Sequence, residues 1–239
     1  MQPLAGKVAI VTGASRGIGK AISILLAQSG SRVVLAARSE PQLKSVREEI
    51  SSQNGEALVI PTDLTVDKEM EQLVQQTLKE WGSVDVLINN AGLGKVAPVV
   101  KAKVSDWDET FRVNLRAPMF LSKLVLPTMM EKGEGSIINI SSVSGKSGEA
   151  NGAAYSASKF GLMGFTQSLY EEVREYGIRV AAICPGFVDT PLIPQMRRMD
   201  RSKMIRPEDI AQTVLFVLTS PATACPVEII VRPQRTPYA

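Results

Sequence analysis

Short runs of β-branched and apolar residues alternate with longer amphipathic stretches over all 239 residues, and this alternation limits the possible folds more than any other feature. It predicts strands at 8–12, 32–36, 56–60, 84–88, 136–140, 179–183 and 227–231. It predicts helices at 18–28, 40–51, 68–81, 105–131, 155–176 and 207–218. Strands that are apolar throughout, such as 84–88, indicate a sheet covered on both faces. We therefore expect an α/β fold in which residues 1–239 form a single domain, a doubly wound, parallel, seven-stranded sheet with helices on both faces.

The segment after the first predicted strand, 12–19, reads TGASRGIG and opens the first helix. In doubly wound sheets, ligands bind beyond the carboxyl ends of the strands. Glycines there allow a tight turn and let a pyrophosphate approach backbone N–H groups at a helix N-terminus. An ordinary glycine turn is the alternative, but the position directly after the first strand of a βαβ unit favours dinucleotide binding.

The end of the second predicted strand bears on the choice of dinucleotide. NAD-binding sites usually place a carboxylate there to accept from the ribose 2′-hydroxyl. Segment 36–39 reads AARS and has no acid. Arg38 and the loop residue Arg16 can instead grip a 2′-phosphate with planar, multi-donor side chains. Either arginine alone is compatible with a solvated surface charge, but together they favour NADP(H).

Polar residues also follow the next three predicted strands. Asp63 can accept a hydrogen bond from the adenine amine or cap the following helix. Segment 89–92, NNAG, can simply end its strand or bring backbone close to the cofactor. Ser141 and Ser142 follow the fifth strand, where capping is the alternative to a catalytic role.

The chain contains no histidine, which excludes His-ligated zinc, Ser-His-Asp hydrolysis and imidazole as the acid of a dehydrogenase. Tyr155 and Lys159 are four residues apart and share one face of a predicted helix. A phenol normally titrates near 10. We expect the lysine ammonium to stabilise the phenolate and to lower the pKa of Tyr155 toward the working pH, as proton transfer requires.

These segments together resemble the short-chain dehydrogenase/reductase family over nearly the whole chain. The matching motifs are TGASRGIG at 12–19, NNAG at 89–92, Asn114, Ser142, YSASK at 155–159 and Pro185-Gly186. The resemblance implies a Rossmann fold, a nicotinamide cofactor, an alcohol or carbonyl substrate and a homodimer or homotetramer.

The resemblance also implies a catalytic tetrad of Asn114, Ser142, Tyr155 and Lys159. Ser142 would polarise the substrate carbonyl, Tyr155 would protonate the alkoxide, and Lys159 would hold the nicotinamide ribose. Asn114 would anchor a water that links Lys159 to solvent, although its hydrogen bonding can equally kink the long helix. The predicted NADP(H)-binding residues are Gly13, Ser15, Arg16, Gly17, Ile18, Gly19, Arg38, Ser39, Asp63, Leu64, Asn90, Ala91, Gly92, Tyr155, Lys159, Pro185, Gly186, Val188 and Thr190.

Substrate identity is expected to depend on segments 185–206 and 144–151. The first holds Met196, Arg197, Arg198, Met199, Arg201, Lys203, Met204 and Arg206. These basic residues can steer an anionic substrate, but a solvated loop whose methionines pack as a lid is the favoured alternative. Many reductases of 3-oxoacyl groups on acyl carrier protein end in Thr-Gly-Gln and Asp-Gly-Gly motifs, and their carrier-docking positions are often basic. Segment 224–233 lacks those motifs, and the docking positions fall at Gly133 and Tyr176.

The leading hypothesis is an NADPH-dependent carbonyl or oxoacyl reductase, which reduces a ketone, aldehyde or 3-oxoacyl group to an alcohol by hydride transfer. A 3-oxoacyl-[acyl-carrier-protein] reductase, an NADP-dependent 3-hydroxy acid dehydrogenase and a non-catalytic NADP-sensing protein are the alternatives. Sugar epimerases share the Tyr-x-x-x-Lys pair but carry a substrate domain for which this chain has no room.

Other sequence features exclude further classes. A net charge of +3, from 27 basic and 24 acidic residues, argues against a nucleic-acid-binding protein. No apolar run is long enough for a membrane span, and no metal site is predicted. Cys184 and Cys225 are too sparse for a disulfide framework and are interpreted as buried, inert thiols. We expect a cytoplasmic protein.

Overall fold

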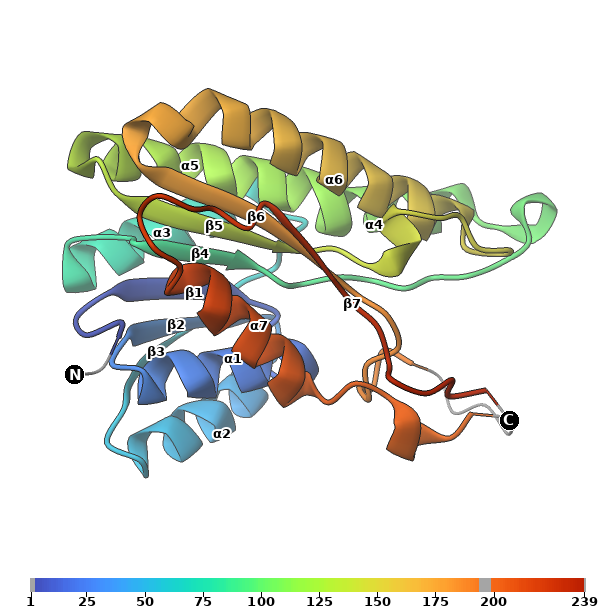
Figure 1. Ribbon diagram of the computed structural model, residues 1–239, viewed down its shortest axis with the longest axis horizontal. Coiled ribbons are helices and arrows are strands. Elements are labelled where there is room, and N and C mark those ends of the chain that lie inside the picture. Colours follow the sequence, from blue (N-terminus) through green and yellow to red (C-terminus); the bar gives the residue numbers. More distant parts are fainter. Residues whose placement is uncertain (1–2, 194–198, 239) are drawn as a thin grey trace.

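The computed structural model describes residues 3–193 and 199–238, and its strands form one parallel sheet in the order β3-β2-β1-β4-β5-β6-β7 (Figure 1). The strands are β1 Val8–Thr12, β2 Arg32–Ala37, β3 Glu56–Pro61, β4 Val86–Asn89, β5 Gly135–Ile140, β6 Ile178–Pro185 and β7 Glu228–Val231. The helices are α1 Gly17–Gln28, α2 Glu40–Ser51, α3 Asp67–Trp81, α4 Val104–Phe111, α5 Ala117–Lys132, α6 Ala153–Val173 and α7 Pro207–Leu218. The predicted fold is confirmed.

Alternate residues of each inner strand serve two different cores, because successive side chains of a strand point to opposite faces. In β1, Ala9 and Val11 pack in the core with residues of α1, α2 and α7, whereas Ile10 packs in the core with residues of α3, α5 and α6. Figure 1 shows α1 and α7 on one side of the sheet and α5 and α6 on the other. Burial on both faces explains why these strands have no polar alternation.

The predicted helix at 105–131 is wrong as a single helix. The structure divides it into α4, a π-helical turn at Arg112–Arg116, and α5. Asn114, fully buried in that turn, accepts from the backbone N–H of Leu93 at 2.7 Å and donates to the Leu93 carbonyl at 2.9 Å. It also donates to Ser158 Oγ at 3.1 Å. These bonds to distant segments account for the widened turn, because they hold the Asn114 side chain at a position that a regular α-helix would not give it.

The other differences from the predicted elements lie at their ends. The strand predicted at 84–88 begins at Val86, and the helix predicted at 155–176 begins at Ala153. That helix is α-helical to Val173, continues as a tight 3₁₀ turn, and stops at Gly177, whose φ of 70° is left-handed. Glycine tolerates this conformation without strain.

The strand order reverses between β1 and β4, so that the chain leaves these two neighbouring strands toward opposite sides of the sheet. Thr12, at the end of β1, holds the loops that follow them together: its hydroxyl accepts from the backbone N–H groups of Asn90 and Ala91 at 3.0 and 3.1 Å. Asn90 Nδ2 donates to the Thr12 carbonyl at 2.8 Å. Such a switch point is where doubly wound sheets bind ligands. Across the described ranges, none of the helices combines the length and apolarity needed to cross a membrane.

Candidate active site

The loop between β1 and α1 has the backbone geometry that its glycines predict. Gly13 and Gly17 have φ angles of 65° and 57°, which side chains disfavour. A Cβ at Gly17 would lie 3.1 Å from Thr190 Cγ2, so the loop comes close to the segment after β6. The first strand end and the sixth thus approach each other, as a binding cleft for a dinucleotide requires.

The N-terminus of α1 is suited to an anion. Its N-cap residue, Arg16, makes no side-chain capping bond, and the first turn has no acidic residue. Arg16 and Arg38 are both exposed, and neither side chain is in an ion pair with another residue of the described ranges. Free N–H groups, the helix dipole and two unpaired guanidinium groups fit a phosphate-bearing dinucleotide.

The remaining candidates for the cofactor differ in their surroundings. Ser15 is half-buried, Ile18 packs against the core, and Ser39 is the N-cap of α2 without a side-chain bond. The side chains of Leu64 and Val188 lie in the two cores, so only their backbone can face the cleft. At the end of β6, Pro185 belongs to the strand, and the N–H of Gly186 donates to Val231 of β7 at 2.8 Å.

Asp63 is engaged locally. Its Oδ1 accepts from the Thr65 backbone N–H at 2.9 Å and from the Thr65 hydroxyl at 2.8 Å. Val66, not Asp63, is the N-cap of α3. The carboxylate therefore stabilises the turn before α3, and a role toward adenine stays a prediction.

Gly92 leaves a space between two of the predicted catalytic residues. A Cβ at this position would lie 3.6 Å from Asn114 Oδ1 and 3.7 Å from Lys159 Nζ. The structure therefore places the side-chain ends of Asn114 and Lys159 next to Gly92, whose lack of a side chain leaves the backbone of segment 89–92 accessible there. The kink alternative for Asn114 agrees with its bonds to Leu93, and its role toward a water stays a prediction.

Ser142 both caps a turn and meets the phenol. Its Oγ accepts from the Ser144 backbone N–H at 3.1 Å, at the start of the short turn Val143–Gly145. It also hydrogen-bonds the hydroxyl of Tyr155, which favours the phenolate. Ser141, by contrast, donates to the backbone carbonyl of Lys159 at 3.4 Å and joins the turn to α6. Of the two serines, Ser142 is thus the one beside the phenol, and its catalytic role stays a prediction.

The expectation that Lys159 lowers the pKa of Tyr155 is wrong for this structure. Burial raises the pKa of Tyr155, and this effect outweighs the hydrogen bond from Ser142, while the charge of Glu149 raises the pKa further. Lys159 Nζ lies 5.8 Å from the centre of the tyrosine ring and donates to the Ile140 carbonyl at 2.8 Å. The two groups do lie together, but desolvation of the phenol dominates.

Burial also changes the pKa of Lys159. Desolvation lowers the pKa of its ammonium to about 8, against 10.5 in water. Below about pH 8 the folded protein must hold this group charged in the interior, whereas the unfolded chain holds it charged in water. Folding stability attributable to Lys159 is therefore lowest below pH 8 and recovers as the pH rises toward 10.5, because the unfolded state binds more protons in that interval.

We therefore expect the unfolding free energy of wild type to rise between pH 7 and pH 9.5 by about 2 kcal/mol more than that of Lys159→Met. The variant lacks the buried ammonium, so any stability advantage that it has over wild type is larger at pH 7. Urea unfolding of both proteins at the two pH values measures this change. The control is Lys79→Met, an exposed lysine on α3. A difference between Lys159→Met and wild type that does not vary with pH would contradict the assignment.

Two described basic residues of segment 185–206, Arg201 and Lys203, are paired within the segment. Arg201 Nε donates to Asp189 Oδ1 at 2.7 Å, and its Nη2 donates to the Thr190 carbonyl at 3.1 Å. Lys203 pairs with Asp200 at 3.2 Å. These pairs agree with the solvated-loop alternative and give Arg201 a structural role beside Thr190. Met196, Arg197 and Arg198 lie outside the described residues.

Three residues at the site were not predicted to act there. Thr12 joins the first and fourth strand ends, and the Ile140 carbonyl orients Lys159. Glu149 lies in segment 144–151, which was predicted to affect specificity, but nothing in the sequence pattern distinguished its carboxylate. Burial raises the pKa of the Cys184 thiol to about 11, which agrees with an inert thiol, and Cys225 is half-buried.

Comparisons with known proteins match the chain over almost its whole length. Residues 7–201 match the family model described as short chain dehydrogenase. An uncharacterized oxidoreductase of Staphylococcus aureus (strain MRSA252) is 37% identical over 98% of this chain and 100% of its own. A 3-oxoacyl-[acyl-carrier-protein] reductase of Synechocystis sp. is 36% identical over 94% of both chains. A crystal structure of a metagenomic short-chain oxidoreductase in complex with NADP is 39% identical, with a TM-score of 0.86 over 98% of this chain and 100% of that one.

Proposed function

The chain belongs to the short-chain dehydrogenase/reductase family, and on this premise we propose that it is an NADPH-dependent reductase of a carbonyl group in a ketone, aldehyde or 3-oxoacyl compound. The observation that carries the proposal is the contact between Tyr155 and Ser142, with buried Lys159 behind the phenol. A proton donor and a carbonyl-polarising hydroxyl are thus adjacent beyond the carboxyl end of β5, at the sheet edge where doubly wound folds bind ligands.

Each residue of the site has a part in this reduction. Bound NADPH supplies the hydride. Ser142 donates a hydrogen bond to the substrate carbonyl and fixes its position. Tyr155 gives its proton to the oxygen as negative charge develops there, and a raised pKa keeps the phenol protonated at neutral pH, as a general acid must be. Lys159 binds the ribose, and Asn114 positions a water that returns protons from solvent.

The 2′-phosphate of NADPH would be held by Arg16 and Arg38. Both guanidinium groups are exposed and unpaired with described residues, near the free N-terminus of α1. The similar metagenomic oxidoreductase, solved with NADP, supports this preference. Bidentate contacts between arginine and phosphate are strong and selective.

We expect Arg38→Asp to weaken NADPH binding by about 10- to 100-fold while changing NADH binding much less, because a carboxylate repels the 2′-phosphate and accepts from a 2′-hydroxyl. Fluorescence titration with each nucleotide measures the two affinities. Arg47→Asp, an exposed charge reversal on α2, is the control. Equal losses for both nucleotides would refute the assignment.

A second candidate function is reduction of 3-oxoacyl groups on acyl carrier protein, which the Synechocystis relative favours. The test that separates the candidates is loss of NADPH absorbance with ketones, aldehydes, 3-oxoesters, 3-oxoacyl thioesters, 3-oxo acids and quinones, with NADH in parallel. Oxidation of NADPH by simple ketones or aldehydes supports the general reductase. Consumption with none of these compounds would favour an NADP-sensing binding protein.

The proposal includes a cytoplasmic homodimer or homotetramer. The two free thiols agree with a reducing compartment. Apolar side chains stand on the outer surface of the helical layer formed by α4, α5 and α6, where Phe111, Met119 and Phe160 are 37%, 44% and 46% exposed. We propose that these side chains are buried where copies of the chain associate. Light scattering on the purified chain measures the assembly.

A further inference from the structure

A carboxylate, Glu149, lies in the exposed loop between β5 and α6, close to Ser144 and Ser142. Its Oε1 accepts from Ser144 Oγ at 3.1 Å, and its backbone carbonyl accepts from the N–H of Gly152 at 3.1 Å. Ser144 is almost fully buried, and its N–H donates to Ser142 Oγ, the hydroxyl that meets the phenol. A short chain of hydrogen bonds therefore holds the acid beside the reacting groups.

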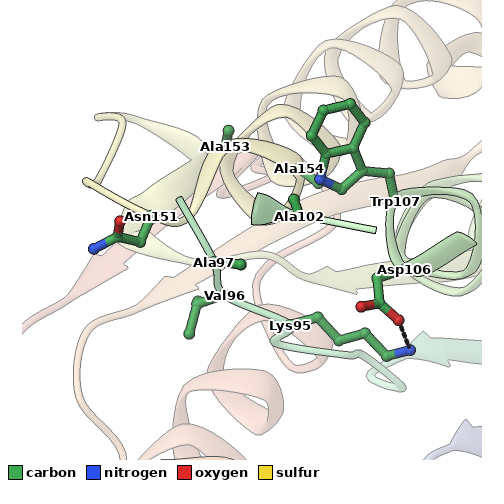
Figure 2. A pocket seen from close by; sticks show the side chains of 9 residues that line it. All are labelled: Lys95, Val96, Ala97, Ala102, Asp106, Trp107, Asn151, Ala153 and Ala154. Atoms are coloured by element: carbon green, nitrogen blue, oxygen red, sulfur yellow. Dashed lines mark hydrogen bonds and ion pairs between the residues drawn. The ribbon is translucent and has the colours of Figure 1, made fainter. Parts of the chain in front are cut away.

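No described cation neutralises this acid. Lys95 pairs with Asp106 at 2.7 Å and with Glu109 at 2.5 Å. In Figure 2 the Lys95 side chain extends toward Asp106 and away from Asn151. The chain around Lys95 does lie beside the loop that carries Glu149, because the N–H of Ala97 donates to the Asn151 carbonyl at 2.8 Å. Among the residues of 3–193 and 199–238, no ion pair includes Glu149.

Other cations of the loops after β5 and β6 are also engaged. Arg201 is bound to Asp189 and to the Thr190 carbonyl, and Lys146 pairs with Glu228 at 3.0 Å. Lys159 faces Tyr155 from the interior and donates to Ile140. Its ammonium lies on the face of the phenol ring, whereas Glu149 belongs to the exposed loop between β5 and α6 and is linked to Ser142 through Ser144. Among the described residues, the negative charge of Glu149 is therefore uncompensated, and it lies two hydrogen bonds from Ser142.

We infer that Glu149 is a specificity-determining residue that repels anionic substrates, so that the enzyme acts on carbonyl compounds that are neutral or positively charged near the reacting carbon. This inference rests on the proposed reductase function. It disfavours free 3-oxo acids, whose carboxylate lies two bonds from the reacting carbon. The effect of Glu149 on Tyr155 agrees with its closeness, because its charge also raises the pKa of the phenol.

The experiment compares three benzaldehydes that differ in charge: methyl 4-formylbenzoate, 4-formylbenzoate and 4-(trimethylammonio)benzaldehyde. Steady-state kinetics with NADPH give kcat/KM for each aldehyde with wild type and with Glu149→Gln, which keeps an acceptor for Ser144. We expect the ratio of kcat/KM for the anion to that for the ester to rise about 5- to 30-fold in the variant, as for a unit charge roughly 8 Å away at an effective dielectric of ~20–40. The corresponding ratio for the cation should fall.

Two further variants make the comparison independent of a change in folding. Glu149→Lys should reverse the order of anion and cation. Glu80→Gln removes the same charge from the exposed end of α3 and should leave both ratios as in wild type. Unfolding midpoints and NADPH affinity show that each variant is folded.

The outcomes separate this inference from the proposed function. Anion-to-ester ratios that are equal in wild type, Glu149→Gln and Glu149→Lys would overturn the role of Glu149 while the reductase stands. A wild-type preference for the anion would do the same. Absence of NADPH oxidation with all three aldehydes and with every compound of the wider screen would overturn the reductase itself.

Discussion

Replacement of Tyr155 by phenylalanine should lower turnover by about 10²-fold or more while NADPH still binds. The change removes one hydroxyl and keeps the ring on α6, so that the cleft retains its shape. It leaves Ser142 without its phenol partner and leaves the alkoxide without a proton donor. The chain has no histidine that could substitute for it. Single-turnover kinetics with a carbonyl compound from the screen, together with fluorescence titration of NADPH, separate the loss of chemistry from the loss of binding.

Tyr170→Phe is the matched control for this experiment. Tyr170 is half-buried on the same helix, and its ring is packed by Arg174, whose Cζ is 5.9 Å from the ring centre. Removal of this hydroxyl should leave turnover within about twofold of wild type, because surface substitutions outside the site have small effects. Activity near wild type in Tyr155→Phe would show that another group supplies the proton.

The second large effect is expected from Gly19→Ala in α1. A Cβ at Gly19 would lie 2.2 Å from the carbonyl oxygen of Gly13 and 2.4 Å from Asn90 Nδ2. Gly13 offers backbone, which no change of side-chain rotamer can move. The helix must therefore shift away from the loops after β1 and β4. We expect this shift to lower the unfolding free energy by about 3 kcal/mol, which is at the upper end for overpacked cores. It should also weaken NADPH binding at least ~10-fold, because the displaced loop is the predicted phosphate site.

Gly164→Ala provides the comparison. Gly164 is an exposed residue within α6, and a Cβ there meets no heavy atom within 4 Å. Alanine is the better helix former by about 1 kcal/mol, so this variant should be as stable as wild type or more stable. Urea unfolding and nucleotide titration apply to both variants. Wild-type stability and affinity in Gly19→Ala would mean that the close approach of α1 to Gly13 is not needed.

Burial of Lys159 and Tyr155 illustrates a general tension between stability and function. Both groups are desolvated, which lowers the pKa of the lysine to about 8 and raises the pKa of the tyrosine. Each shift brings a cost in folding for the ionised form. The same shifts keep the phenol protonated and available as an acid. Perturbed groups that face a cleft are typical of catalytic sites.

Local sequence signals predicted most of the fold. The helix at 40–51 and the strand at 8–12 agree with the structure at both ends. The helix follows β2 after two residues and carries Pro41 in its first turn, and the strand ends at the glycine loop. Such signals act within a few residues. A kink at Asn114 was raised only as an alternative within 105–131, and its partner Leu93 was not foreseen because the pairing spans 21 positions of the chain.

The candidate site was predicted in the same uneven way. Tyr155 and Lys159 were placed together because four residues make one turn of a helix, and the structure has them on α6. Arg201, by contrast, was one of several basic residues in a loop, and only the structure pairs it with Asp189. Glu149 belongs to no motif, and it became a candidate only through its hydrogen bond with Ser144 and the effect of its charge on Tyr155.

The amino-acid sequence by itself determined the parallel α/β architecture, the glycine loop at the first strand end and the spacing of the tyrosine and the lysine, since these depend on periodicity and on local backbone freedom. Only the tertiary structure decided which charges are paired, which are buried and which stand alone at the cleft. Ion pairing and desolvation depend on groups that are distant in sequence. The sign of the pKa shift at Tyr155, and the lack of an ion-pair partner for Glu149 among residues 3–193 and 199–238, therefore became visible only in the folded chain.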